Sequence, residues 1–265
     1  MLHDLALTSS PHDQDGSIPL EQIAARVAAE ARPTPTDRPW VATNMVVSLD
    51  GATAVGGVSG QLGSEVDAAV FHALRGVADI VLAGSRTATA ERYRPPSPSE
   101  SIRDARQGRG QQPAPLLAVV SNRGDIDLAL PMFGAGERRP VLLVAAGQVP
   151  DERRQRLDEV ADVIATGDER VDLAAALRAM RSTSGAELVV CEGGPTLNGV
   201  LIADDLVDEW CLTLAPLLVA GDSGRAAVGA PVDHLRRLDL VRAWRHEAEL
   251  LLRYVRPTTP VASAP

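Results

Sequence analysis

Short apolar runs alternate with helical patterns through the middle of the chain. Each run of strand length is followed by a stretch in which apolar residues recur every three or four positions, the spacing of a helix with one buried face. The expected strands span residues 41–47, 78–83, 116–120, 141–145, 161–165 and 187–191. The expected helices span residues 20–32, 64–76, 151–157, 173–181 and 195–202. Repeated strand–helix units of this kind predict a parallel sheet covered by helices.

The last quarter of the chain changes character, because strand-length runs follow one another with turns and no helices between them. These runs lie at residues 209–219, 239–244 and 250–255. Parallel units followed by late consecutive strands predict the fold class: α/β, a three-layer sandwich with a mixed, mainly parallel central sheet.

Proline and glycine positions set the expected boundaries. Residues 1–38 are expected to form a mobile tail and one helix, since closely spaced prolines then interrupt the chain. Connections are short after that point, which predicts a single domain over residues 39–258 followed by a C-terminal tail at 259–265. Residues 95–115 are rich in proline and in charged residues, so we expect a long loop there.

The absence of lysine narrows the chemistry more than any other feature of the composition. All 26 basic residues of the 265 are arginines. This excludes a lysine-containing phosphate loop, a Schiff-base lysine for pyridoxal phosphate, and the Tyr/Lys pair of short-chain dehydrogenases. Only backbone amides, hydroxyls and arginine remain to hold a phosphate.

Charge and hydropathy exclude several classes of partner. The net charge is −9, and no basic stretch with interleaved aromatic residues is present, which argues against a nucleic-acid partner. No apolar run approaches the ~18 residues of a membrane span, and the acidic start lacks the features of a signal peptide. Cys191 and Cys211 lie in apolar segments without zinc-ligand spacing, so we expect a cytoplasmic protein with reduced thiols and no metal site.

A paired-glycine turn after a buried strand is the motif that best fits ligand binding. The motif consists of Glu192, Gly193, Gly194, Pro195, Thr196 and Leu197. Glycine lets a ligand approach the backbone, and a helix that begins at proline offers unpaired N–H groups to an anion such as a pyrophosphate. The alternative is a tight turn whose glycines serve geometry alone. A carboxylate at the carboxyl edge of an α/β sheet favours the first interpretation.

Two further turns follow buried strands. In the first, Arg86 and Thr87 come after Gly84 and can clasp a phosphate, although Thr87 may equally serve as a helix cap. In the second, Ser121 and Arg123 place a hydroxyl near a guanidinium, a pair that suits the 2′-phosphate of NADP. The alternative for Arg123 is an ordinary solvated surface position.

Three other polar positions are candidates for chemistry. Asp50, two residues after Ser48 at the end of the first strand, can serve in proton transfer or simply form a turn before glycine. Arg75, at the end of a helix, can cap the helix or bind a substrate anion. Ser223 lies in a Gly-Asp-Ser-Gly sequence similar to a serine-protease nucleophile loop, but the chain lacks the other landmarks of that fold. No GxGxxG dinucleotide motif follows a strand.

Several segments together resemble one known family. They are SLDG, HALRGVADIVLAGSRT, LLAVVSN and LVVCEGGPTLNGVLIADDLVDEWCLTLAPLLVAG. In this order, from about Trp40 to Val255, they resemble the reductase domain of the bacterial bifunctional riboflavin-biosynthesis deaminase/reductase. The resemblance implies the fold of dihydrofolate reductase and a homodimer. The zinc motifs of the deaminase half, H-x-E and P-C-x-x-C, do not occur.

The resemblance also implies a reaction and a set of site residues. The reaction is the NADPH-dependent reduction of a ribosylamino-pyrimidine 5′-phosphate, with hydride reaching the ring-opened imine carbon and Asp50 or Glu192 organising the proton. The cofactor-binding residues that it implies are Val46, Thr87, Glu91, Ser121 and residues 194–200. The substrate-binding residues that it implies are Ser48, Ser59, Arg75 and Glu192.

The chain departs from the family pattern mainly on the substrate side. Ala52 replaces a common lysine or arginine, Gln61 replaces a tryptophan, and an Asp-Pro pair is missing around residues 91–95. These changes leave the native substrate open, so a pteridine reductase similar to dihydrofolate reductase is an alternative. A non-catalytic NADP-binding protein of the same fold is a second alternative, and a hydrolase using Ser223 is a third.

Overall fold

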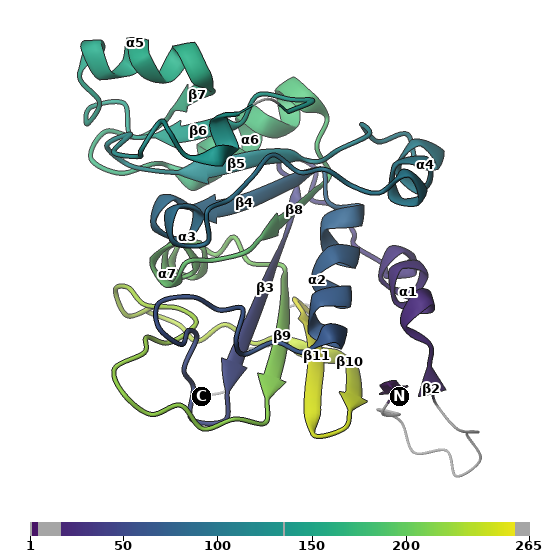
Figure 1. Cartoon of the computed structure of the whole chain (residues 1–265). Helices are drawn as coiled ribbons and strands as arrows, with labels where there is room; N and C mark the ends of the chain where they lie inside the picture. The colour runs from purple at the N-terminus through teal and green to yellow at the C-terminus, as the bar shows by residue number, and fades with distance from the viewer. Residues whose placement is uncertain (1, 5–16, 135, 258–265) are drawn as a thin grey trace.

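One continuous sheet of eleven strands runs through the described part of the chain, which comprises residues 2–4, 17–134 and 136–257 of a computed structural model (Figure 1). The strands are β1 (Leu2–Asp4), β2 (Ser17–Ile18), β3 (Trp40–Ser48), β4 (Ile80–Gly84), β5 (Leu116–Val120), β6 (Val141–Val144), β7 (Asp162–Ala165), β8 (Leu188–Cys191), β9 (Glu209–Ala215), β10 (Asp239–His246) and β11 (Glu249–Val255). Their order in the sheet is β2-β1-β10-β11-β9-β3-β8-β4-β5-β6-β7. Neighbours are parallel from β7 to β9 and antiparallel from β9 to β2. The mixed, mainly parallel sheet expected from the sequence is confirmed.

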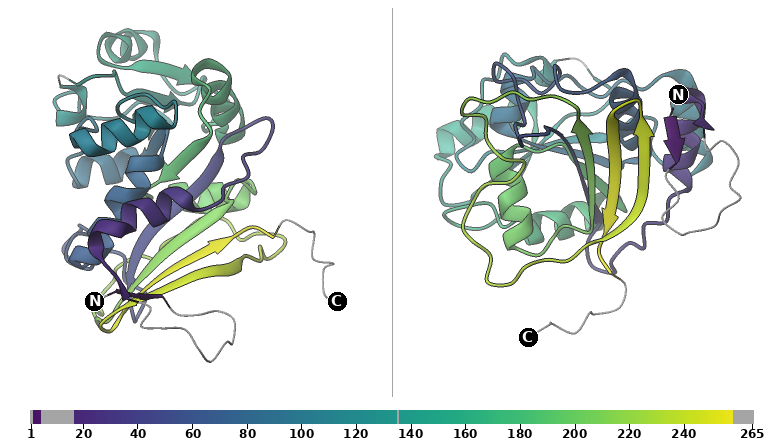
Figure 2. Two further views of the ribbon diagram at one scale, coloured as in Figure 1. Left: turned by 90° about the vertical axis from the view of Figure 1, so that its right-hand side faces the viewer. Right: turned by 90° about the horizontal axis from the view of Figure 1, so that it is seen from below.

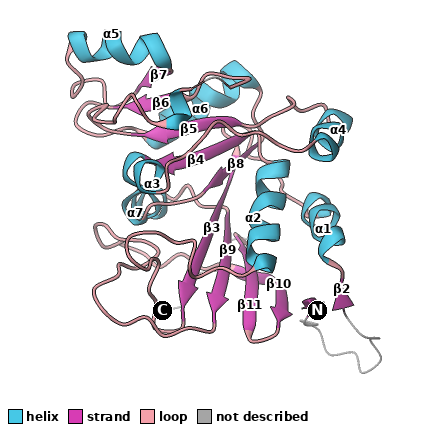
Figure 3. Ribbon diagram, viewed as in Figure 1, coloured by secondary structure: helices cyan, strands magenta, loops and turns pink. Residues whose placement is uncertain are grey.

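Helices cover both faces of the sheet (Figures 2 and 3). They are α1 (Ile23–Ala29), α2 (Glu65–Val77), α3 (Ser85–Ala90), α4 (Glu100–Gly108), α5 (Asp151–Val160), α6 (Leu173–Ser184) and α7 (Pro195–Ala203), with 3₁₀ turns at Leu20–Gln22 and Pro131–Phe133. Alternation along β3 supplies both cores: Ala42 packs with Val27 and Leu74 on one face, and Val41 packs with Leu177 on the other. Among the described residues, no helix has the length and apolar character needed to cross a bilayer.

Helix α2 has an N-cap residue and an apolar face that packs against the sheet. The Ser64 hydroxyl accepts hydrogen bonds from the N–H groups of Val66 and Asp67, which caps the first turn. Val70 and Leu74 are buried four residues apart on the face toward the sheet. The last turn carries Arg75, and its position there follows from this packing.

The stretch at residues 95–115, expected to be a loop, contains α4. The sequence of α4 lacks an apolar stripe, and the residue that the helix buries fully is Arg106. The Arg106 guanidinium donates to the carbonyls of Gly76 at 3.1 Å and Ala78 at 2.6 Å, which fastens α4 to the end of α2. Strand β9 also ends earlier than expected, at Ala215, since the next residue is a proline without an N–H for the ladder.

The expected N-terminal tail contributes two short strands. Strand β1 pairs antiparallel with β10, β2 pairs with β1, and Ile18 is buried. The rest of that expected tail, residues 5–16, lies outside the described residues, as does the expected C-terminal tail at 259–265.

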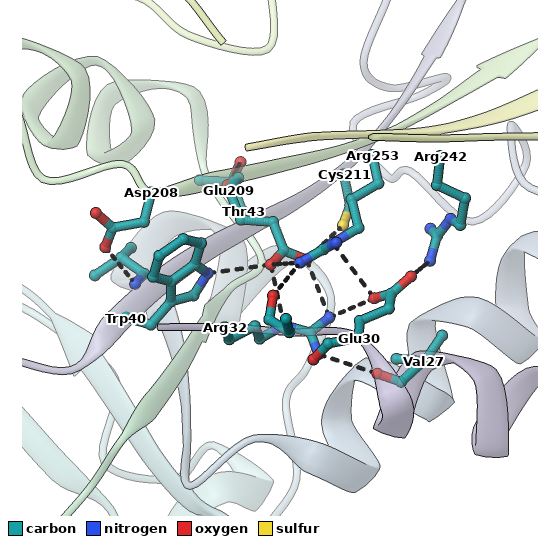
Figure 4. Close-up of polar contacts among 12 residues, drawn as sticks. Val27, Glu30, Arg32, Trp40, Thr43, Asp208, Glu209, Cys211, Arg242 and Arg253 are labelled. Carbon is teal, nitrogen blue, oxygen red and sulfur yellow. Dashed lines mark hydrogen bonds and ion pairs between the residues drawn. The ribbon is translucent and has the colours of Figure 1, made fainter. Parts of the chain in front are cut away.

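A buried ionic network joins the segment after α1 to the antiparallel strands (Figure 4). We call it the Glu209 network; its members are Glu30, Arg32, Trp40, Glu209, Arg242 and Arg253. The fully buried Glu209 carboxylate accepts from Arg32 Nε at 3.0 Å, Arg253 Nη2 at 2.9 Å and Trp40 Nε1 at 3.1 Å. Burial acts to raise the pKa of Glu209, but the hydrogen bond from Arg253 and the charge of Arg32 outweigh it and lower the pKa to about 2.

Candidate active site

A cavity of about 940 Å³ lies at the carboxyl ends of β3, β4, β5 and β8. This edge of an open α/β sheet is where ligands bind, and the volume falls in the range of small-molecule sites. Its other walls come from the loop after β3, the start of α7 and the loop that follows β9. The predicted site residues that line it are Ser59, Thr87, Glu91, Ser121, Glu192, Gly194, Pro195, Thr196 and Leu197.

Two glycine corners meet at the base of this cavity. The Gly84 N–H donates to the Gly193 carbonyl at 2.8 Å, which joins the turn after β4 to the turn after β8. A Cβ atom added to Gly194 would lie 2.5 Å from Thr87 Oγ1, so a larger residue would displace the Thr87 side chain. Gly193 has φ of +87°, a conformation that favours glycine, and its peptide bond to Gly194 is cis. Gly193 and Gly194 are therefore the constrained glycines of the two corners, whereas a Cβ atom at Gly84 would make only ordinary contacts.

Helix α7 presents its N-terminus at the cavity wall. Gly194 is its N-cap, Pro195 occupies the first turn, and no side chain caps its N–H groups. Thr196 and Leu197 follow and line the cavity. Exposed N–H groups and the positive end of the helix dipole together favour an anion such as a pyrophosphate.

Glu192 reaches the cavity as a buried carboxylate, and both of its oxygens accept hydrogen bonds from protein groups. Arg75 donates to it through Nε at 2.5 Å and Nη2 at 2.7 Å, and the Tyr93 hydroxyl donates at 2.6 Å. The side chain of Glu192 is 2% exposed and that of Arg75 is 29% exposed. Burial acts to lower the pKa of Arg75, but the hydrogen bond and charge of Glu192 prevail and raise it. Both Arg75 and Glu192 were predicted from the sequence, and the structure brings them together.

Tyr93 is a site residue that the sequence did not predict. It lies in the loop after α3, where no periodicity or motif marks it, and its ring lies 5.4 Å from the Arg75 guanidinium. Burial first, and the charge of Glu192 second, raise the pKa of Tyr93 well above its usual value. The hydroxyl therefore stays protonated and serves as a donor to Glu192.

Asp50 does not line the cavity, contrary to what a proton-transfer role requires. Its carboxylate accepts the Ser48 hydroxyl and the N–H groups of Val219 and Ala220, the latter at 2.7 Å. The Ser48 hydrogen bond, followed by these backbone bonds, lowers the pKa of Asp50 to about 2. Asp50 is thus an ionised anchor for the loop after β9. Ser48 is buried, and its hydroxyl also accepts from the Ala52 N–H at 2.8 Å.

Arg123, which the sequence indicated as a ligand of the 2′-phosphate of NADP, does not supply a guanidinium group to the cavity. Arg123 is exposed and does not line the cavity, because the turn after β5 carries its side chain to the surface. Arg86 and Arg170 line it instead. Arg86 Nη2 donates to Thr196 Oγ1 at 2.9 Å, and Arg170 pairs with Asp204 at 3.1 Å. Arg86 was already part of the predicted glycine turn, whereas Arg170 had no sequence signal.

Four further predicted residues, Val46, Ser48, Arg75 and Gly193, also lie outside the lining, and Arg75 acts there through its contact with Glu192. Val46 lies beside Met45, which lines the cavity, so strand alternation turns Val46 to the other face of the sheet. Gly193 contributes its carbonyl to the corner with Gly84 but is not part of the lining.

The loop after β3 is held over the cavity from both sides. Glu91 accepts the N–H of Ser59 at 2.8 Å and its hydroxyl at 3.0 Å. On the other side, the Ser223 hydroxyl accepts from the N–H groups of Thr53 and Ala54. Ser223 is therefore a fastening residue, and the cavity lining of the described chain contains no histidine to activate it. The hydrolase alternative lacks its base.

The arrangement separates two kinds of binding function within one cavity. Glycine corners, hydroxyls and two arginines suit a phosphate-rich ligand, and an arginine-paired carboxylate suits a ligand with N–H or cationic groups. The described residues contain no group of three or more His, Cys, Asp or Glu side chains placed to hold a metal ion.

Similarity to known proteins extends over most of the chain. Residues 39–252 match the family model described as the RibD C-terminal domain. The chain is 32% identical over 186 residues to the 2,5-diamino-6-ribosylamino-4(3H)-pyrimidinone 5′-phosphate reductase of Archaeoglobus fulgidus, a match that covers 69% of this chain and 83% of the relative. The protein of the same name from Methanothermobacter thermautotrophicus is 28% identical over 222 residues, with coverage of 82% and 98%.

A solved structure has the same architecture. A pyrimidine reductase-like protein from Corynebacterium diphtheriae superimposes with a TM-score of 0.78 and 25% sequence identity. The match covers 90% of this chain and 98% of that structure.

Proposed function

Because the chain belongs to the RibD C-terminal domain family, we propose that it reduces a ribosylamino-pyrimidine 5′-phosphate to the ribitylamino product with NADPH. The observation that carries the proposal is the cavity that joins two glycine corners to the arginine-paired Glu192. The relatives from Archaeoglobus fulgidus and Methanothermobacter thermautotrophicus are named as reductases of a ribosylamino-pyrimidinone 5′-phosphate, which supports the substrate class.

NADPH fits the glycine-corner side of the cavity. The uncapped N-terminus of α7 suits its pyrophosphate, and the hydroxyls of Thr87, Thr196 and Ser121 supply further hydrogen bonds. A side chain at Gly194 would close this cradle, as the 2.5 Å approach to Thr87 demonstrates. When bound, NADPH supplies the hydride for the reduction. We assign the preference for its 2′-phosphate to Arg86 and Arg170 in place of Arg123.

Glu192 is the residue that we propose to hold the reacting end of the substrate. As an ion-paired carboxylate, it accepts hydrogen bonds from the substrate and stabilises positive charge on a protonated, ring-opened imine. Arg75 and Tyr93 fix both of its oxygens, so the carboxylate is already oriented before the substrate binds. Asp50 takes part only by positioning the loop after β9.

Oxidation of NADPH by the purified protein tests the proposal. The protein is offered the ribosylamino-pyrimidine phosphate and dihydrofolate in parallel assays, and NADPH binding is measured separately by energy transfer from tryptophan. Oxidation with the pyrimidine alone is the expected result. Oxidation with dihydrofolate alone would establish the pteridine alternative, and binding without oxidation of either would establish the non-catalytic one.

We also propose that the protein acts as a homodimer in the cytoplasm, as the family resemblance implies. Two buried free thiols, Cys191 and Cys211, suit a reducing compartment. The test is light scattering on the purified protein, and the expected result is the mass of two copies. The mass of a single copy would contradict the proposal.

A further inference from the structure

A second cavity, of about 490 Å³, lies at the opposite edge of the sheet, where β4 and β8 begin. Its walls come from the end of α1 and the segment after it, the end of α2, the end of α4, the turn after α6 and the start of β8. We call it the arginine pocket, after Arg106, Arg109 and Arg138 in its lining; Arg32 also lines it but is paired with Glu30 and Glu209. Its lining carboxylates are Asp79 and Glu187. The pocket shares no residue with the candidate active site.

Two arginines of this pocket, Arg106 and Arg109, donate to backbone carbonyls. Arg106 is fully buried and donates to the backbone carbonyls of Gln112, Gly76 and Ala78. Arg109 also donates to the Gly76 carbonyl, at 2.8 Å. Carbonyls at a helix end carry about half an elementary charge in total, so they offset only part of the charge of two guanidinium groups. Within the described residues, none of the three arginines has a carboxylate within ion-pair distance.

The two lining carboxylates offset only part of the positive charge of the lining arginines. One carboxylate oxygen of Asp79 accepts a hydrogen bond from the Gln111 side chain at 2.8 Å, and the other accepts from the N–H groups of Glu187 and Leu188. Glu187 is exposed to solvent. The pKa of Arg106 is lowered to about 10, by burial first and also by the charges of Arg109 and Arg138, against the opposing charge of Asp79. An excess of positive charge therefore remains in the pocket of a chain whose net charge is −9.

We propose that the arginine pocket binds a small molecule through a phosphate group. A phosphate has enough oxygens and charge to accept from several guanidinium groups at once, and arginine is the residue best shaped to donate to it. The volume of the pocket suits a molecule larger than a free ion. This proposal does not depend on the reductase function, because the two cavities lie at opposite edges of the sheet.

Tungstate, a tetrahedral oxyanion with strong anomalous scattering, locates the site in crystals of the whole chain. The expected result is an anomalous peak in the pocket, within hydrogen-bond distance of Arg109 and Arg138. Absence of density there, with peaks at other arginines, would overturn the proposal.

Calorimetric titration with pyrophosphate then separates binding in solution from an adventitious ion only. We expect R109Q and R138Q each to weaken pyrophosphate binding at the arginine pocket about tenfold or more, because each variant loses a charge-assisted hydrogen bond. Binding of pyrophosphate elsewhere on the protein should not change. R156Q, which removes an exposed arginine paired with Glu152 outside the pocket, serves as the matched control and should bind like the parent. Unchanged affinity in the R109Q/R138Q double variant would refute the proposal. NADPH affinity, measured on the same variants, should equal that of the parent, because the arginine pocket is separate from the candidate active site. A parent protein that fails to bind NADPH would count against the reductase proposal and not against the arginine pocket.

Discussion

Glu192 and Glu209 are both buried glutamates paired with arginine, yet they occupy sites of opposite kind. Glu209 has donors from Arg32, Arg253 and the Trp40 indole, and it lies inside the protein between β9, β11 and the segment after α1 (Figure 4). Glu192 has one guanidinium and one phenol, and it lines the cavity. Burial and ion pairing alone therefore do not identify a functional carboxylate. What separates the two is whether a side of the group remains open to a ligand.

The largest expected effect is on stability, at Glu209. Glu209→Gln should lower the free energy of unfolding by about 3–5 kcal/mol, because the buried Arg32, Arg242 and Arg253 are then left to share the single carboxylate of Glu30. Urea unfolding followed by circular dichroism measures this loss. Glu152→Gln, which breaks an exposed pair on α5, is the control and should cost less than about 0.5 kcal/mol. A similarly small loss for Glu209→Gln would show that the network is not a structural anchor.

The same substitution should change the acid sensitivity of the fold. The pKa of Glu209 is about 2 in the folded chain and about 4.3 in an unfolded one. A lowered pKa contributes stability that is present above the unfolded value and is lost as the pH falls toward the folded one. The parent protein should therefore lose stability between about pH 4.3 and pH 2, and Glu209→Gln should lack this part of the decline. Parallel declines in the two proteins would contradict the assignment.

The next effect is on catalysis, at Glu192. Glu192→Gln should lower kcat/KM by about 10²–10³-fold, the loss of one preorganised charge at the reacting group, while NADPH affinity stays nearly the same. Glu65→Gln, an exposed change in the first turn of α2, is the control. Loss of NADPH binding in Glu192→Gln would place this carboxylate on the cofactor side and reverse our assignment.

A smaller effect should distinguish the cavity arginines from the surface one. Arg86→Gln should reduce the preference for NADPH over NADH about tenfold, because a charge-assisted hydrogen bond to the 2′-phosphate is lost. Arg123→Gln should leave the preference unchanged, since its side chain does not line the cavity. Dissociation constants for both cofactors supply the ratio. A shift in Arg123→Gln alone would restore the assignment made from the sequence.

The smallest effect is expected at Tyr93. Tyr93→Phe removes one hydrogen bond to Glu192 but leaves both bonds from Arg75 in place, so kcat/KM should fall by about tenfold at most. Because the pKa of Tyr93 is raised well above its usual value, the variant should keep the pH profile of the parent through the neutral range. A new ionisation in the parent profile that Tyr93→Phe abolishes would instead make Tyr93 a proton donor.

Local features of the fold and the site were predictable from the sequence. The glycine corner at residues 192–197 was found because a strand, two glycines and a helix start are adjacent in the chain. The parallel units were found because each buried strand and the helix after it have a distinct period. The family resemblance is confirmed by the match over residues 39–252.

Features that depend on distant contacts were not predictable. Helix α4 was missed because it is held by a buried arginine, Arg106, and periodicity registers only apolar positions. Tyr93 meets Glu192 across 99 residues, with no motif to connect them. Arg123 was assigned on its adjacency to Ser121, but the turn after β5 directs it to the surface, and Arg170 from another loop occupies the cavity wall instead.

Isotope transfer tests the reductase assignment most directly. The protein is incubated with the ribosylamino-pyrimidine phosphate and NADPH deuterated at the transferred position of the nicotinamide ring, and the product is examined by mass spectrometry and NMR. The account predicts one deuterium on the former imine carbon of the ribityl chain, with Glu192→Gln forming the same labelled product far more slowly. If the folded parent protein binds NADPH but forms no labelled product, the reductase assignment is contradicted.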